Sequence, residues 1–446
     1  MSRSISALIF ASKTESPLFR VGTLPVLLRT ILAMRKLGVS KILVYADPTA
    51  RRKAEYELMK TGRFPCDVEW IEPRSGVSLP RLLLQVLDAS KAHELLVVDG
   101  RTAYQPALLR KACEWTGEDG ALSLTTAGKP IGIQVFSAIF AREAAELCPS
   151  YVYTLDELQA WLTSTSGVQC DEVEPESWQQ IVTPEDRVAA ERKLDLWLVK
   201  PTDGIFARMN RRVSVPISRQ LIKLPITPNM VSLFTLGVGL VAGIFFGCGG
   251  YWSVLVGAIL SVCASILDGC DGEVARLKLM ESDFGCWLET VCDWLYYLFI
   301  FAGMAIGLSK NLKPATFIGW GSMLVFGAVM SFVITGFGRH RFAKGRPEQY
   351  LRIWQSNAQR RRSNPILYIG RNTEFIIRRC FLPYALLFFA LLNIMKVAFF
   401  LTAIGANVVW LVSLYSYGAF DRVRGRRDKS VRVSPDPVAS GSVQPL

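Results

Sequence analysis

Hydrophobic and polar positions divide the chain into two parts with different patterns. Over residues 1–200, short apolar runs alternate with charged segments. Residues 229–337 and 381–417 instead hold long runs that are almost free of charge. The first pattern is typical of a soluble α/β domain, and the second of helices that cross a membrane. The sequence therefore predicts a soluble domain joined to a membrane domain.

The first part has the periodicity of alternating strands and helices. A helix is expected over 25–38, where apolar residues recur every three or four positions and Gly38 marks the stop. Strands separated by such helices predict a mostly parallel sheet with helices on both faces. The expected strands are Ala7–Ala11, Lys41–Tyr45, Val68–Ile71, Glu94–Val98 and Ile131–Phe136.

The second part predicts an all-α transmembrane domain of six helices. Each run is long enough for an apolar core of ~30 Å. The loops alternate between strongly basic and nearly uncharged, so the positive-inside rule places both termini in the cytoplasm, at the inner membrane if the cell is bacterial. The expected spans are 229–249, 251–270, 285–307, 313–337, 376–395 and 397–418.

These patterns give four expected parts. They are an α/β domain at 1–190, a linker with an interfacial amphipathic helix at 191–227, the six-span domain at 228–420, and a basic, disordered tail at 421–446. Within them, the polar and proline-marked residues 163–187 are expected to form a linker region, followed by a helix over 186–199.

The net charge of +13 is compatible with nucleic acid or with an anionic membrane surface. Its location favours the membrane, because the densest clusters of Lys and Arg flank the apolar runs at 338–380 and 422–429. We therefore expect contacts with membrane lipid and none with nucleic acid.

Four carboxylates interrupt the apolar pattern at helical spacing. Asp268 and Asp271 share one helix face, as do Glu289 and Asp293. Ionised carboxylates near hydrocarbon are costly and repel each other, so a cation is expected to neutralise them. Ligation by carboxylates alone suits Mg²⁺ or Mn²⁺ and not zinc. The alternative is a set of buried acids that make hydrogen bonds between helices.

The residues around these acids resemble the signature of the CDP-alcohol phosphotransferases (CDP-alcohol phosphatidyltransferases), membrane enzymes that build phospholipids and related phosphodiesters. The family's third acid is usually Asp, and Glu289 extends that stem by one methylene. The resemblance implies a homodimer in which the four acids bind metal and Asp293 is the catalytic base. Beside the departure at Glu289, seven positions match the signature: Asp268, Asp271, Gly272, Ala275, Arg276, Gly285 and Asp293.

The small side chains of this signature point to a nucleotide site. Gly272 and Ala275 lie one helical turn apart after the second acid, where a ligand can approach the backbone. The resemblance adds Gly285 as further space for the cytidine and gives Arg276 a partner in an acid or a phosphate.

The segment 200–233 mixes apolar and basic residues and is expected to be an interfacial helix. Three short sequences in it resemble family members whose membrane domain follows a nucleotidyltransferase. They are Asp203-Gly204, Asn210-Arg211 and Ile226-Thr227-Pro228-Asn229. Thr227 is expected to cap a helix that begins at Pro228. Arg208 and Asn229 either face the nucleotide diphosphate or only contact headgroups and cap the helix.

A basic cluster after the fourth span suits an acceptor that carries its own phosphate. Ordinary positive-inside charge is the alternative reading. The cluster consists of Arg339, Arg341, Lys344 and Arg346.

Residues 20–47 and 95–109 resemble the Rossmann-like nucleotidyltransferase fold that activates sugars and inositol phosphate with CTP. In that family a glycine-rich loop wraps the triphosphate and a Lys follows it. Here the loop has shrunk to residues 11–15, and Ser16 stands where the Lys is expected, while Asp99 keeps a metal-binding position. Such a loop cannot bend its amides around three phosphates.

Three interpretations of the soluble domain stay open. It is a degenerate domain that binds nucleotide or regulates the membrane part, an active cytidylyltransferase that uses Lys13 or Arg20, or a structural remnant. The resemblance of the whole chain is to bifunctional proteins that join an inositol-phosphate cytidylyltransferase to a phosphatidylinositol-phosphate-type synthase.

The expected activity is transfer of a substituted phosphoryl group from a CDP-linked donor to the hydroxyl of a polar alcohol, with release of CMP. The donor is CDP-diacylglycerol or a CDP-inositol-like compound, and the acceptor can carry a phosphate. A catalytically decayed scaffold and an ion-binding transporter are the alternatives, since either can also hold buried acids.

Overall fold

The computed structural model divides by its internal contacts into two compact units. We call them the N-terminal unit (Met1–Thr202, Val215–Ile226 and Glu273–Met280) and the helical unit (Asp203–Ser214, Thr227–Gly272 and Glu281–Leu446). The structure describes residues 4–11, 16–73, 77–117, 119–149, 152–199, 203–309, 313–343 and 380–432.

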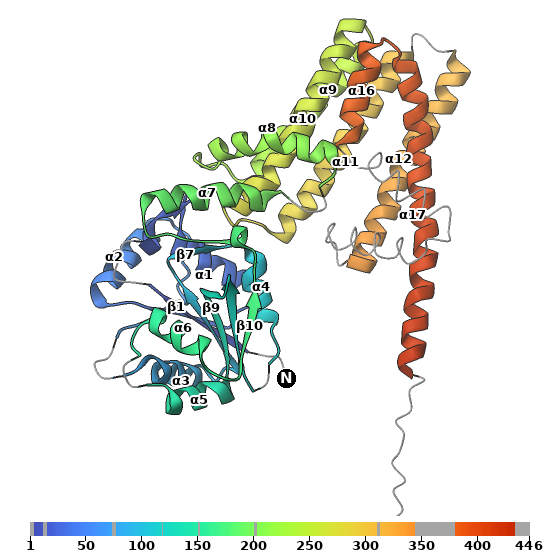
Figure 1. The fold of residues 1–446 in the computed structure, drawn as a ribbon. Coiled ribbons are helices and arrows are strands. Elements are labelled where there is room, and N and C mark those ends of the chain that lie inside the picture. The colour runs from blue at the N-terminus through green and yellow to red at the C-terminus, as the bar shows by residue number, and fades with distance from the viewer. Residues whose placement is uncertain are drawn as a thin grey trace, which may run out of the picture. The chain divides into compact units, whose positions relative to one another are not determined.

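A seven-stranded sheet forms the centre of the N-terminal unit, with strand order β10-β8-β9-β6-β1-β4-β5 (Figure 1). Strand β9 pairs antiparallel with β6 and β8, and the other neighbours run parallel. The prediction of a mostly parallel sheet is confirmed. The strands are β1 (Ile5–Phe10), β4 (Lys41–Tyr45), β5 (Glu69–Ile71), β6 (Glu94–Asp99), β8 (Ala121–Thr126), β9 (Lys129–Ser137) and β10 (Val168–Glu172).

Helices cover both faces of this sheet because its strands are apolar on both sides. Successive strand residues point to opposite faces, so Ile9 and Val98 enter one buried core while Leu8 and Val97 enter the other. The first core lies under α1 (Val26–Lys36), α2 (Pro48–Met59) and α4 (Pro106–Glu114), and the second under α3 (Leu79–Ser90), α5 (Ala138–Leu147) and α6 (Leu155–Thr163).

The predicted linker region at 163–187 is wrong, because this segment completes the unit. Strand β10 pairs with β8, and β11 (Trp178–Gln180) pairs with β7 (Thr102–Tyr104). Strand β10 lies at the sheet edge and is largely exposed, so its residues lack the apolar signal of a strand. The remaining short elements are η1 (Ser16–Leu18), β2 (Arg20–Val21), β3 (Leu24–Pro25) and η2 (Pro175–Ser177).

The helix expected over 186–199 is α7 (Pro184–Leu198), which begins two residues earlier than predicted. Thr183 and Asp186 form a reciprocal capping box at its start. The hydrogen bonds from the backbone amides of Thr183 and Val182 to the Asp186 carboxylate lower the pKa of Asp186.

Five helices in the described part of the chain are long and apolar enough to cross a membrane. The predicted span at 376–395 is represented there only by α16, a shorter apolar helix, so the count of six is not confirmed. The helices of this part of the chain are α8 (Ile205–Leu221), α9 (Pro228–Cys248), α10 (Tyr251–Leu277), α11 (Asp283–Ser309), α12 (Pro314–Ala343), α16 (Phe381–Leu391) and α17 (Met395–Arg432).

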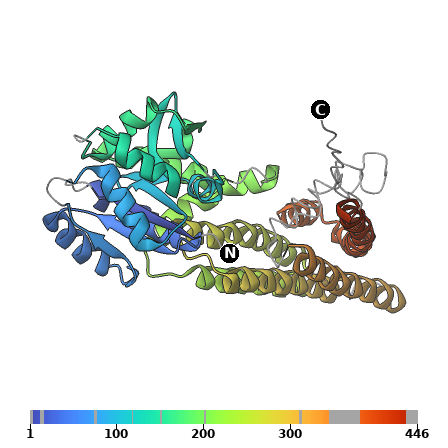
Figure 2. The same cartoon turned by 90° about the horizontal axis from the view of Figure 1, so that it is seen from below.

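Helix α9 begins where the sequence predicts, with Pro228 in its first turn and the Thr227 hydroxyl accepting from the amide of Met230. Helices α9 and α11 then run side by side (Figures 1 and 2). Glycines allow their backbones to touch: a Cβ at Gly243 would lie 2.6 Å from the Phe299 carbonyl oxygen. Small residues at such a crossing are the usual way in which membrane helices pack closely.

Polar side chains join α12 to α17. The Asn407 amide donates to the Met323 carbonyl oxygen at 2.9 Å, and the Tyr417 hydroxyl donates to the Ile334 carbonyl oxygen at 2.5 Å. Each bond satisfies a polar group that is costly to leave unpaired in an apolar setting.

The crossing of α9 and α11 predicts that Gly243→Ala destabilises the protein. The new methyl group has to displace the backbone at Phe299, and overpacking of this kind costs about 1–3 kcal/mol. Thermal unfolding of the detergent-purified protein measures the effect. Gly319→Ala is the control, since nothing lies within 4 Å of a Cβ there. Equal unfolding temperatures for the two variants would contradict the tight crossing.

Candidate active site

The first two acids lie one helical turn apart on α10. Asp271 is 4% exposed, and its carboxylate accepts hydrogen bonds from the Ser232 hydroxyl of α9 at 2.6 Å and from the amide of Gly272 at 2.5 Å. Asp268 is half-buried. The hydroxyl from α9 therefore fixes the orientation of one carboxylate of the pair.

The other two acids lie on α11 at the same spacing and are half-buried. The Asp271 carboxylate interacts electrostatically with those of Asp268 and Glu289. Asp268 on the same helix and Glu289 on α11 thus both lie within electrostatic range of Asp271. Asp293 lies one turn beyond Glu289, with its Oδ1 atom buried.

A buried tyrosine links the same two helices. The hydroxyls of Tyr296 on α11 and Ser261 on α10 share a hydrogen bond of 2.5 Å. Tyr296 also lies within electrostatic range of Asp268. This hydrogen bond restricts the sliding of α11 along α10 near the acids.

The donor chemistry of these acids fits a hard divalent cation, because every candidate ligand is a carboxylate oxygen. Their mutual repulsion also favours a positive ion between them. Among the described residues, no three His, Cys, Asp or Glu side chains gather closely enough to hold a metal ion. The acids therefore match a cation in type and charge without forming a closed coordination shell.

The predicted nucleotide residues fall into two groups. Asn229, at the start of α9, lies beside Gly285 in the first turn of α11, where a Cβ would be 3.5 Å from the Asn229 side-chain oxygen. Gly272 is half-buried next to Asp271, whereas Arg208 is exposed on α8. The second group, Ala275 and Arg276, lies in the last turn of α10, which belongs to the N-terminal unit.

Two residues without an assigned role contact the turn that carries the acids. The Arg211 guanidinium donates to the Gly269 carbonyl oxygen at 3.2 Å and pairs with Asp203 at 3.3 Å. The Asn210 amide donates to the Ser265 carbonyl oxygen at 3.3 Å and accepts from the Tyr384 hydroxyl at 2.6 Å. The N-R pair in the sequence was the signal that could have found them.

The predicted acceptor-phosphate cluster lies only partly in the described residues. Arg339 and Arg341 belong to the last turns of α12, and the exposed Arg341 guanidinium lies 5.9 Å from the Phe337 ring centre. Lys344 and Arg346 lie outside the described residues.

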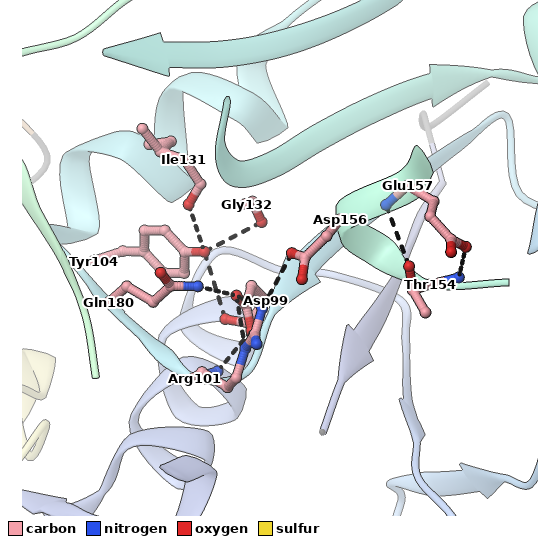
Figure 3. Close-up of polar contacts among 9 residues, drawn as sticks. All are labelled: Asp99, Arg101, Tyr104, Ile131, Gly132, Thr154, Asp156, Glu157 and Gln180. Atoms are coloured by element: carbon pink, nitrogen blue, oxygen red, sulfur yellow. Dashed lines mark hydrogen bonds and ion pairs between the residues drawn. The ribbon is translucent and has the colours of Figure 1, made fainter. Parts of the chain in front are cut away.

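In the N-terminal unit, Asp99 at the end of β6 is held by Arg101 (Figure 3). The guanidinium donates to both carboxylate oxygens, at 3.1 Å to Oδ1 and 3.0 Å to Oδ2. The Gln180 amide donates to Oδ2 at 3.3 Å, and Asp156 accepts from the same guanidinium at 3.3 Å. Arg101 thus occupies the oxygens that a metal ion would need.

The electrostatics of this cluster agree with its geometry. Burial lowers the pKa of Arg101, but the hydrogen bonds and charges of Asp99 and Asp156 outweigh burial and raise it overall. Of the two cations proposed for an active cytidylyltransferase, Lys13 lies outside the described residues, and the exposed Arg20 lies 3.9 Å from Glu57.

Solved structures resemble the N-terminal part weakly. The 4-diphosphocytidyl-2C-methyl-D-erythritol synthase from Anaerococcus prevotii covers 43% of this chain and 98% of its own, with 17% identity and a TM-score of 0.33. The inositol-1-phosphate CTP transferase from T. maritima covers 43% of this chain and 96% of its own, with 12% identity and a TM-score of 0.32.

Curated relatives extend over more of the chain. A bifunctional IPC transferase and DIPP synthase from Aquifex aeolicus is 28% identical over 347 residues, which is 70% of this chain and 76% of the relative. The protein of the same name from Archaeoglobus fulgidus is 30% identical over 181 residues, 40% of this chain and 36% of the relative. Residues 225–350, which include all four acids, match the family model for CDP-alcohol phosphatidyltransferase. The similarity to the CDP-alcohol phosphatidyltransferase family therefore covers the part of the chain that carries the four acids.

Proposed function

We propose that the protein is an integral membrane CDP-alcohol phosphotransferase of phospholipid or related phosphodiester biosynthesis. It transfers a substituted phosphoryl group from CDP-diacylglycerol or a CDP-inositol-like donor to the hydroxyl of a polar alcohol and releases CMP. The observation that carries the proposal is the electrostatic contact of Asp271 with Asp268 and Glu289 inside the matched family domain.

The acids have separate roles in this proposal. Asp268, Asp271 and Glu289 hold Mg²⁺ or Mn²⁺, and the Ser232 hydroxyl keeps Asp271 in place. The ion, when bound, neutralises the diphosphate and stabilises the departing CMP. Asp293 takes the proton of the acceptor hydroxyl. The hydroxyl oxygen then forms a bond to the donor phosphorus, and the phosphorus–oxygen bond to CMP breaks.

The neighbouring residues bind the two substrates. Gly272, Ala275 and Gly285 leave room for cytidine, and the side chains assigned to the diphosphate are Arg208, Asn229 and Arg276. An acceptor phosphate binds the basic cluster of Arg339, Arg341, Lys344 and Arg346. With both termini in the cytoplasm, soluble CDP compounds reach the site from the cytosol and a lipid enters from the bilayer. By resemblance to the family, the enzyme is a homodimer.

The N-terminal unit is proposed to perform no nucleotidyl transfer. Its Asp99 is neutralised by Arg101 within the protein, so it offers no open carboxylate for a metal-bound triphosphate. An active cytidylyltransferase is tested by the pyrophosphate assay below. A purely structural remnant is tested by the substitutions of Arg29 and Arg63 described in the next section.

Asp293→Asn is expected to remove CMP release almost completely, because the amide cannot accept the acceptor's proton. Binding of the CDP-linked donor should be nearly unchanged. Release of labelled CMP and equilibrium donor binding measure the two effects in membranes that contain the purified protein. Asp283→Asn on the same helix is the matched control, since Asp283 is exposed in the first turn of α11. Turnover retained by Asp293→Asn would refute the assignment of the base.

Glu289→Asp separates an enzyme from a decayed scaffold or a transporter. Shortening the stem moves a proposed ligand by about one methylene, and changes around metal ligands typically alter activity by about 10–100-fold. We therefore expect CMP release to change by on the order of tenfold or more. A scaffold or an ion-binding transporter would show no metal-dependent CMP release in either form.

The full-length protein is expected to release no pyrophosphate from CTP, Mg²⁺ and a panel of alcohol phosphates. The physical reason is the closed Asp99–Arg101 pair, in which Arg101 binds both carboxylate oxygens of the predicted metal ligand. A coupled pyrophosphate assay measures the outcome. Pyrophosphate release that Asp99→Asn abolishes would show an active cytidylyltransferase.

A further inference from the structure

The end of α10 is built into the core of the N-terminal unit. The segment Glu273–Met280 belongs to that unit, and Val274, Leu277 and Leu279 are buried in its hydrophobic clusters. Helix α10 is uninterrupted from Tyr251 to Leu277, so the helix that ends in this segment also carries Asp268 and Asp271. Val274 and Leu277 pack in a cluster with Val21, Val26, Ala190, Leu194 and Ile222.

Two arginines from the N-terminal part of the chain satisfy the last carbonyl groups of this segment. Arg29 of α1 donates to the Leu277 carbonyl oxygen at 2.7 Å and to that of Val21 at 2.9 Å. Arg63 donates to the carbonyl oxygens of Lys278 and of Leu279, the latter at 3.1 Å. The final carbonyls of a helix lack partners within the helix and carry partial negative charge, so guanidinium groups bind there favourably.

Arg29 is kept charged in spite of its burial. The side chain is 8% exposed, and burial together with the charges of Arg219 and Arg63 lowers the pKa of Arg29 to about 10, while Glu191 opposes the shift. The group remains protonated at neutral pH. A buried cation is costly unless it is hydrogen-bonded, so these carbonyls are specific partners and not incidental neighbours.

Residues 218–226 form further hydrogen bonds with the same segment. The Lys278 ammonium donates to the carbonyl oxygens of Leu224 and Ile226, both at 2.8 Å. The Ser218 hydroxyl donates to the buried Glu273 carboxylate at 2.6 Å. Hydrogen bonds at both its beginning and its end therefore fix the segment's rotation and its position along the helix axis.

We propose that Arg29 and Arg63 are positioning residues for the phosphotransfer reaction, because they hold the end of the same helix, α10, that carries Asp268 and Asp271. This inference rests on the proposed function. A helix rises about 1.5 Å per residue and turns about 100° with it, so a slip of one residue at its end displaces both acids.

The test uses the full-length protein with Arg63→Gln, since Arg63 is only half-buried and its loss leaves the core intact. We expect weaker Mn²⁺ binding by electron paramagnetic resonance, a higher half-saturating Mg²⁺ concentration, and a kcat for CMP release lower by about 10–100-fold. The two metal readouts do not depend on how much protein is folded. Arg63→Lys keeps the charge and should restore part of the loss.

Arg35→Gln is the matched control on α1, because Arg35 is exposed and lies 3.4 Å from Asp67 at the surface. It should leave Mn²⁺ binding and kcat unchanged. Arg29→Lys is a second test in which the charge stays but the forked donor is lost, and it should shift the metal readouts in the same direction as Arg63→Gln.

Unchanged Mn²⁺ affinity and half-saturating Mg²⁺ in both Arg63→Gln and Arg29→Lys would overturn the proposal, even if less folded protein were recovered. Absence of CMP release from the wild-type protein would instead contradict the proposed function. In that case, weaker Mn²⁺ binding by Arg63→Gln would still support positioning of the acids by Arg63.

Discussion

The cost of placing carboxylates on apolar helices is the constraint on which this molecule depends. Asp271 is buried, and the carboxylates of Asp268 and Glu289 act on it electrostatically. Like charges at close range in an apolar setting oppose folding. The Ser232 hydroxyl compensates one carboxylate only in part, because a neutral donor supplies no charge. In the proposed function, a bound cation would offset this repulsion.

The acids can meet only because their helices approach closely. A Cβ at Gly239 of α9 would lie 2.5 Å from the Tyr296 ring, so the tyrosine fills the space that this glycine leaves. The Tyr296 hydroxyl then bonds Ser261 of α10. One side chain therefore joins three helices, and it lies three residues after Asp293, on the same face of α11. The packing of Tyr296 against Gly239 therefore lies one helical turn from Asp293.

The sequence predicted those elements whose burial pattern is strong and local. The strand Lys41–Tyr45 has the predicted bounds because it is a short apolar run with turn residues on both sides. The edge strand Val168–Glu172 was missed because exposed strands need no apolar residues. The acids and their helices were predicted from spacing, whereas which carboxylates meet depends on how two helices are offset, and spacing within each helix does not contain that information.

The same distinction separates the contacts of the arginines. The pair of Asp99 and Arg101 is two residues apart, and a basic residue that close to a predicted metal ligand was a readable warning. The bond from Arg29 to Leu277 joins residues separated by 248 positions, and no pattern in a single sequence links them. Long-range hydrogen bonds of this kind become visible only when the chain is folded.

Arg101 and Arg29 each place a positive charge against oxygen atoms of the N-terminal unit. Arg101 supplies inside the protein the positive charge that Asp99 would otherwise need from a metal, so this edge of the sheet is satisfied without a ligand. The buried Arg29 likewise satisfies the Leu277 carbonyl oxygen at the end of α10. Both guanidinium groups therefore bind oxygen atoms inside the N-terminal unit, and these bonds stabilise the sheet edge and the helix end from within.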